Sequence, residues 1–283
     1  MNIDGESLQG APVAFSPDEA PAPGGIGATV SHRLGRCVER LENPELKPGW
    51  VVHEVRKDLK RVRALLRLSG DMLRTRRPEK RCAAAARKLS HLRDAAALGE
   101  TLVRLRARAD AAELESLDVL AEALLPAKSA ADHAPALPRP VALEVAETLR
   151  KVKLESEALP FERMDAAALD AGLAESWSDS ARAFRRVVAS PVLPHFHDLR
   201  KAVKRELHQW ELAGRPVDAV DRATLKKMAD VLGELQDLDV LRDRMRAAKL
   251  WRGPVRKLVT RTIRELKGRA LRISFSRYPE SGS

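Results

Sequence analysis

Apolar positions along the chain recur three or four residues apart, which is the spacing of one face of an α-helix. One such stripe consists of Val55, Leu59, Val62 and Leu66. Proline, glycine and capping residues separate the apolar segments, and these residue types mark helix ends. The pattern predicts helices from Trp50 onward and over residues 29–42, 77–109, 111–125, 141–158, 174–189, 192–213, 218–247 and 254–273.

The composition favours the same fold class. Aromatic residues make up only 4% of the 283 residues, and there is a single tyrosine. Residues that favour strands are therefore scarce, whereas helix formers are abundant. With 44% hydrophobic residues the chain can bury a substantial core. We expect an all-α fold.

A basic sequence motif occurs twice, in the same order relative to a second motif. Residues 53–61 read HEVRKDLKR and residues 197–205 read HDLRKAVKR, so both match HxxRKxxKR. Residues 89–94 (LSHLRD) and 232–237 (LGELQD) then match LxxLxD. Two matches in one register indicate duplication of a helical unit. The duplication predicts a two-repeat helical bundle with pseudo-two-fold symmetry around a basic groove or channel.

Segments of different composition flank and divide these repeats. Residues 1–28 are rich in Gly, Pro and Ala without helical periodicity, which predicts a disordered leader. Residues 126–140 (PAKSAADHAPALPRP) hold several prolines and few large apolar residues, which is typical of a linker. The expected organisation is thus a first repeat over 29–125, a second over 141–273 and a tail over 274–283.

The duplicated helices each carry a cationic stripe beside their apolar stripe. A solvated surface would explain one basic helix, but it requires neither a matched histidine nor clustered like charges. Arg offers a fork for phosphate oxygens and Lys a point charge, so the stripes predict a polyanion site. The candidate binding residues are His53, Arg56, Lys57, Lys60, Arg63, Arg67, His197, Arg200, Lys201, Lys204 and His208.

The charge and the cysteine content set limits on partners and compartment. The net charge is +11, although residues 110–180 are acidic, which points to an acidic partner and segregated charge. Cys37 and Cys82 form no CxxC pair, so neither a disulfide framework nor a thiolate zinc site is predicted. No apolar run is long enough to span a membrane. We expect a cytoplasmic protein with no cofactor and no bound metal.

With these two motifs, the sequence resembles the conserved histidine α-helical domain family, CHAD, over residues 29–273. The resemblance implies helices around a basic cavity that binds inorganic polyphosphate, and association of some members with storage granules. It implies contacts from His53, Arg56, Lys60, Arg63, His197, Arg200 and Lys204. The copies differ, since Leu207 stands where the first copy has Arg63, and LSHLRDAAAL lacks the second acidic residue of LGELQDLDVL. The differences argue against symmetric use of the two halves.

Two other functions compete with non-catalytic binding of polyphosphate. A nucleic-acid-binding protein would use the same basic helices, but few aromatic residues are available to stack on bases. A metal-dependent phosphohydrolase would use His53-Glu54 and His197-Asp198, although neighbouring cations oppose a divalent metal. Asp94 and Asp237 are expected to pair with basic residues of neighbouring helices. We therefore expect no enzymatic activity.

Overall fold

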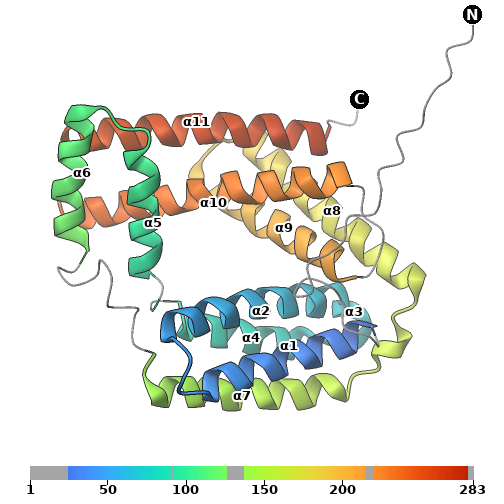
Figure 1. Ribbon diagram of the computed structural model, residues 1–283. Helices are drawn as coiled ribbons and strands as arrows, with labels where there is room; N and C mark the ends of the chain where they lie inside the picture. Colours follow the sequence, from blue (N-terminus) through green and yellow to red (C-terminus); the bar gives the residue numbers. More distant parts are fainter. Residues whose placement is uncertain (1–24, 91, 93, 126–136, 214–218, 280–283) are drawn as a thin grey trace, which may run out of the picture.

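The computed structural model describes residues 25–90, 92, 94–125, 137–213 and 219–279, and within them it contains helices and no strands. The prediction of an all-α fold is thus confirmed (Figure 1). The first half holds α1 (Gly25–Glu42), α2 (Pro48–Leu68), α3 (Gly70–Leu73), α4 (Arg76–Lys88), α5 (Asp94–Arg106) and α6 (Ala111–Leu124). The second holds α7 (Arg139–Glu157), the 3₁₀ turn η2 (Phe161–Arg163), α8 (Ala166–Ala189), α9 (Leu193–Leu212), α10 (Ala219–Ala247) and α11 (Gly253–Arg277).

Prolines and acidic caps fix several of the helix starts. A proline occupies the first or second position of α2, α7, α9 and α11, where its missing N–H leaves no helical bond unmade. Asp110 and Glu113 form a reciprocal capping box at the start of α6. The Asp165 side chain accepts a hydrogen bond from the Ala168 N–H, so α8 begins at Ala166 and not at residue 174 as predicted.

Three other predicted boundaries are wrong. The first helix begins at Gly25, inside the segment assigned to the leader, while residues 1–24 lie outside the described part of the chain. The single segment predicted over 77–109 is divided into α4 and α5. The tail predicted from residue 274 is part of the fold, because α11 continues to Arg277 and the side chain of Tyr278 is buried.

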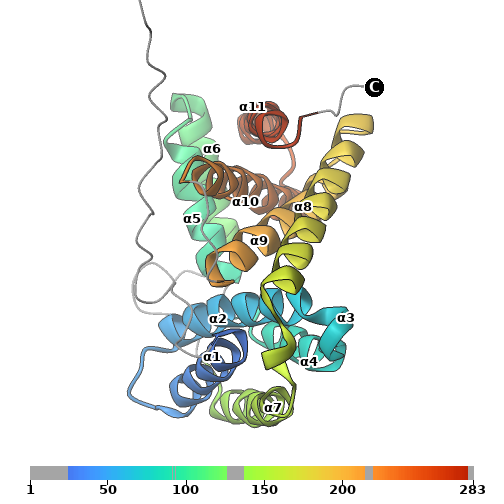
Figure 2. The ribbon, with the colours of Figure 1, turned by 90° about the vertical axis from the view of Figure 1, so that its right-hand side faces the viewer.

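The helices build two hydrophobic cores, one above the other in Figure 1 and Figure 2. The first core is formed by α1, α2, α4 and α7, and the second by α5, α6, α8, α9, α10 and α11. Leu173 of α8 and Leu212 of α9 belong to the first core, so these two helices connect the cores. Buried apolar surface is the main source of stability for both.

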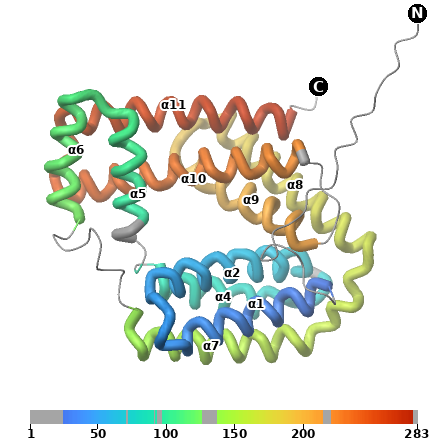
Figure 3. Tube along the Cα trace, in the orientation of Figure 1, coloured from blue at the N-terminus to red at the C-terminus, as the bar shows by residue number. Residues whose placement is uncertain are grey.

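The two cores divide the chain differently from the two sequence repeats. Helices α5 and α6 belong to residues 29–125, yet they pack in the second core against α10 and α11. Helix α7 belongs to residues 141–273, yet it packs in the first core against α1 and α4. The trace in Figure 3 shows this exchange. The predicted linker, 126–140, falls mostly outside the described residues, and α7 already begins at Arg139. The pseudo-two-fold symmetry stays a prediction.

The two helices that carry the repeated motif, α2 and α9, meet where the cores join. The buried Gln209 side chain of α9 donates its Nε2 hydrogen to the backbone oxygen of Ala64 on α2, at 2.9 Å. On its opposite face α2 is attached to α1, since the buried carboxylate of Asp58 accepts hydrogen bonds from Arg33 at 2.7 Å and Arg40 at 2.8 Å. These contacts fix the position of both motif helices.

Candidate functional site

Each motif helix buries its apolar stripe and turns its cationic stripe toward the other motif helix. Val55, Leu59, Val62 and Leu66 of α2 are fully buried, as are Leu199 and Val203 of α9. Burial of these side chains determines how each helix is rotated about its axis. Most of the cationic residues beside each apolar stripe consequently face the space between α2 and α9.

That space contains a cavity of about 280 Å³ between α2 and α9. Every charged residue that lines it is basic, and both copies of the motif contribute. Its lining consists of Ala64 and the basic residues Lys60, Arg63, Arg67, Arg200, Lys201, Lys204, Arg205 and His208. The fold therefore brings together seven of the predicted binding side chains, His208 among them, and adds Arg205 to the same wall. We call this space the α2/α9 cavity.

A second cavity of about 480 Å³ adjoins the first and shares Lys60, Arg200 and Lys204 with it. Arg56 lines it too, but α5 and α10 contribute carboxylates as well as arginines. The additional charged residues are Arg104, Arg244, Glu100, Asp230, Glu234 and Asp237. The groove that the two cavities form is therefore basic at the α2/α9 end and of mixed charge at the other, so the basic groove predicted from the sequence describes one end of it.

Arg200 lies at the junction of the two cavities. Burial lowers the pKa of its guanidinium, and the nearby Asp237 carboxylate acts in the opposite direction. Its Nε atom is buried and has no hydrogen-bond partner among the described residues. Asp237 is paired instead with Arg104 of α5, at 2.7 Å, as expected for a structural carboxylate. Arginine stays protonated in proteins, so Arg200 carries a charge that has lost most of its hydrating water. An anion in the cavity would replace the lost water as a partner for this charge.

Contacts to α4 hold three of the α2 arginines in place. Glu79 accepts hydrogen bonds from Nε of Arg63 at 2.8 Å and from Nε of Arg67 at 3.1 Å. Arg56 donates to the Ser90 hydroxyl and to the backbone oxygen of Ala86. Held side chains lose less conformational freedom when a ligand binds, so these contacts preorganise the cationic wall.

The two motif histidines, His53 and His197, line neither of these cavities. The His53 side chain is 47% exposed, with Glu54 at 3.9 Å, and Lys57 lies 3.8 Å from the same carboxylate. The ring of His197 contacts the side chain of Gln236 on α10 through Nδ1. The matched histidines and Lys57 therefore lie at the margin of the site, away from the lining of the α2/α9 cavity.

His208 is the histidine that lines the α2/α9 cavity. Its Nδ1 lies 3.2 Å from the carboxylate of Glu211 one turn away. Burial lowers its pKa, the Glu211 carboxylate raises it, and the cations of Arg61 and Lys204 lower it further. The ring is therefore sensitive to any negative charge that enters the cavity.

Sequence reasoning missed Arg205, Arg104 and Arg244 as lining residues. Arg205 closes the second copy of the motif, so its position in HxxRKxxKR was a usable signal. Arg104 and Arg244 belong to α5 and α10, and only the packing of those helices places them in the groove. The side chain of Asp94, also expected to be structural, lies outside the described residues.

Within the residues that the structure describes, no group of three or more His, Cys, Asp or Glu side chains is arranged to hold a metal ion. None of the described helices is both long and apolar enough to cross a bilayer.

Comparison with known proteins identifies the family. No curated protein and no solved structure gives a significant match to the chain. The family model of the CHAD domain matches residues 34–246, which include α2, α9 and the groove between them. The match covers most of the chain, and the residues that line the α2/α9 cavity all fall within it. The chain belongs to the CHAD domain family.

Proposed function

We propose that this protein binds inorganic polyphosphate in the α2/α9 cavity and does not cleave it. The observation that carries the proposal is the convergence of both motif copies on one cavity whose charged lining residues are all basic. A linear polyanion can lie along such a groove, with its oxygens bound by Arg and Lys and its counterions released. Membership of the CHAD family supports this ligand class.

The lining of the groove favours a bare phosphate chain over a nucleic acid. Among the described residues, no tryptophan, tyrosine or phenylalanine lines either cavity, so bases would find no stacking partner there. The basic residues lie between two packed helices, and a nucleic-acid duplex is too wide to enter the space between them. We propose that polyphosphate binding holds the protein at the surface of polyphosphate granules in the cytoplasm.

The preference for polyphosphate over nucleic acid is the direct test. Long-chain polyphosphate should bind at least about tenfold more tightly than duplex DNA or single-stranded RNA at matched phosphate concentration. Fluorescence titration at several salt concentrations would measure all three affinities. Every affinity should fall with ionic strength, so the ratio between ligands decides. Equal affinities at moderate salt would contradict the proposal, and release of phosphate during the titration would revive a hydrolytic function.

The affinity for polyphosphate should rise as the pH falls from 8 to 6, and His208 should be responsible. In the empty protein burial lowers the His208 pKa, so the ring is neutral near pH 7. A polyanion would raise that pKa, and binding would take up a proton. Affinity then increases toward lower pH by up to about tenfold for each unit of pKa change. The folding stability of the protein without ligand depends on pH in the opposite direction. The unfolded chain binds the His208 proton more readily than the folded chain, so the stability falls below about pH 6.5.

Titrations at pH 6 and pH 8 on His208→Gln would measure this contribution. The matched control is the double variant His53→Gln/His197→Gln, which removes histidines outside the lining of the cavity. The control should keep the full pH dependence, and His208→Gln should lose most of it. The reverse result would assign the proton uptake to the motif histidines.

A further inference from the structure

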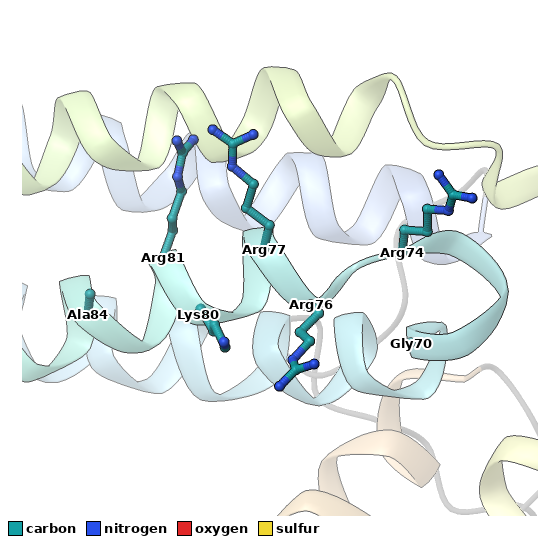
Figure 4. A pocket seen from close by; sticks show the side chains of 7 residues that line it. All are labelled: Gly70, Arg74, Arg76, Arg77, Lys80, Arg81 and Ala84. Carbon is teal, nitrogen blue, oxygen red and sulfur yellow. The ribbon is translucent and has the colours of Figure 1, made fainter.

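A second cationic depression lies where α3 ends and α4 begins, outside both copies of the motif. Its volume is about 820 Å³, and no carboxylate lines it among the side chains that the structure describes. Five cations line it, namely Arg74, Arg76, Arg77, Lys80 and Arg81 (Figure 4). Arg81 pairs with Glu155 of α7, whereas the others are exposed. We call this surface the α3–α4 depression.

The local backbone adds to the positive charge of the α3–α4 depression. Arg74 ends α3 in the left-handed conformation, with φ of 53°, and α4 begins two residues later. No side chain caps α4, because the Thr75 hydroxyl donates instead to the backbone oxygen of Leu66. The first N–H groups of α4 and its dipole therefore favour an anion beside Arg76 and Arg77. Arg74, Arg77 and Arg81 extend to one side of this turn, and Arg76 to the other (Figure 4).

The α3–α4 depression is continuous with the α2/α9 cavity along the surface. Arg67 lines the α2/α9 cavity and also an intervening depression of about 470 Å³, and Gly70 lines both that depression and the α3–α4 depression. The ion pairs of Glu79 on α4 with Arg63 and Arg67 fix the distance between the two basic surfaces.

Two carboxylates, Glu175 and Asp179, line the intervening depression. Asp179 is neutralised by Arg205 at 2.5 Å. Glu175 faces the path without an ion-pair partner among the described residues and would repel the chain locally. A polyanion on this path would therefore be held at its two ends, by the α2/α9 cavity and by the α3–α4 depression, and less strongly between them.

We infer that the α3–α4 depression is a second binding surface for the polyphosphate chain that occupies the α2/α9 cavity. This inference rests on the proposed function and adds that the protein prefers long polyphosphate chains to short ones. A short chain fills the cavity alone, whereas a long chain leaves it past Arg67 and reaches Arg74, Arg76, Arg77 and Lys80. Because the second contact is intramolecular, it raises the affinity for long chains without changing that for short ones.

The test compares tripolyphosphate with long-chain polyphosphate on two variants of equal charge. The first carries Arg74→Gln, Arg76→Gln, Arg77→Gln and Lys80→Gln, all at exposed positions. The control carries Arg256→Gln, Lys257→Gln, Arg264→Gln and Arg269→Gln, which are exposed on α11 and line none of these cavities. The first variant should keep its affinity for tripolyphosphate and lose at least about tenfold for the long chain, while the control keeps both.

The ratio of long-chain to short-chain affinity decides between the outcomes. An unchanged ratio in the first variant, or an equal fall in both variants, would overturn the inference. If thermal unfolding shows that the fourfold variant is destabilised, the double variant Arg74→Gln/Lys80→Gln gives the same comparison with half the charge change. Failure of the proposed function looks different, because the wild-type protein would then bind neither chain in preference to nucleic acid.

Discussion

Replacing both Lys60 and Lys204 by glutamate should weaken polyphosphate binding at least about a hundredfold. Both lysines line the α2/α9 cavity and the adjoining cavity, one from each motif helix. Each substitution removes a cation and adds a carboxylate, and a pair of unit charges 4 Å apart interacts by about 4 kcal/mol near a protein surface. Two reversed charges facing a polyanion therefore exceed the roughly 2.7 kcal/mol that corresponds to a hundredfold loss.

The control for this variant must change the net charge by the same amount at positions elsewhere on the molecule. Lys257→Glu/Arg264→Glu meets that requirement, because both side chains are exposed on α11 and outside these cavities. Arg277 would be unsuitable, since it is partly buried and forms an ion pair with Glu206 at 3.0 Å. Calorimetric titration with long-chain polyphosphate should show a loss of no more than about threefold in the control. Equal losses in the two double variants would indicate attraction by net charge and no defined site.

The helices and the two cationic stripes could be predicted from the sequence because both depend on local order. Val55, Leu59 and Val62 repeat at helical spacing and are fully buried in α2. Burying that stripe leaves little choice about which way Lys60 faces. A duplicated motif on two such helices made a shared groove a reasonable prediction, and α2 and α9 do pack against each other.

Features that depend on contacts between distant segments could not be predicted. Nothing in residues 94–124 indicates that α5 and α6 join the second core, and that packing brings Arg104 and Glu100 into the groove. The matched histidines looked like ligands because they repeat, yet they do not line the α2/α9 cavity, whereas His208, predicted from the cationic stripe of its helix and not from the motif, does. Of the arginines of the α3–α4 depression, Arg74 lies in the turn before α4, whereas Arg76, Arg77 and Arg81 belong to α4. All of them lie outside both copies of the motif, so the repeat gave no signal for this surface.

Glu206→Ala should lower the free energy of unfolding by about 3–5 kcal/mol, although it touches no residue of the cavity lining that we assign. Glu206 is fully buried on α9. It accepts hydrogen bonds from the Tyr278 hydroxyl at 2.6 Å and from Arg277 at 3.0 Å. The alanine would leave a partly buried guanidinium and a buried hydroxyl without this acceptor, and such groups are costly. Glu206→Gln keeps an acceptor for Tyr278 and should cost less, about 1–3 kcal/mol.

Urea unfolding would measure these losses, with Glu265→Ala as the control. Glu265 is exposed on α11 and lies 4.0 Å from Arg108, so its removal should change stability by less than about 0.5 kcal/mol. A loss below about 1 kcal/mol in Glu206→Ala would mean that the C-terminal end of α11 is not held by this carboxylate. Glu206 faces the core while Lys204 and His208 of the same helix line the α2/α9 cavity. The Glu206→Ala substitution weakens the attachment of α9 but leaves the charges of the cavity unchanged. The folded fraction of this variant should therefore bind polyphosphate with wild-type affinity.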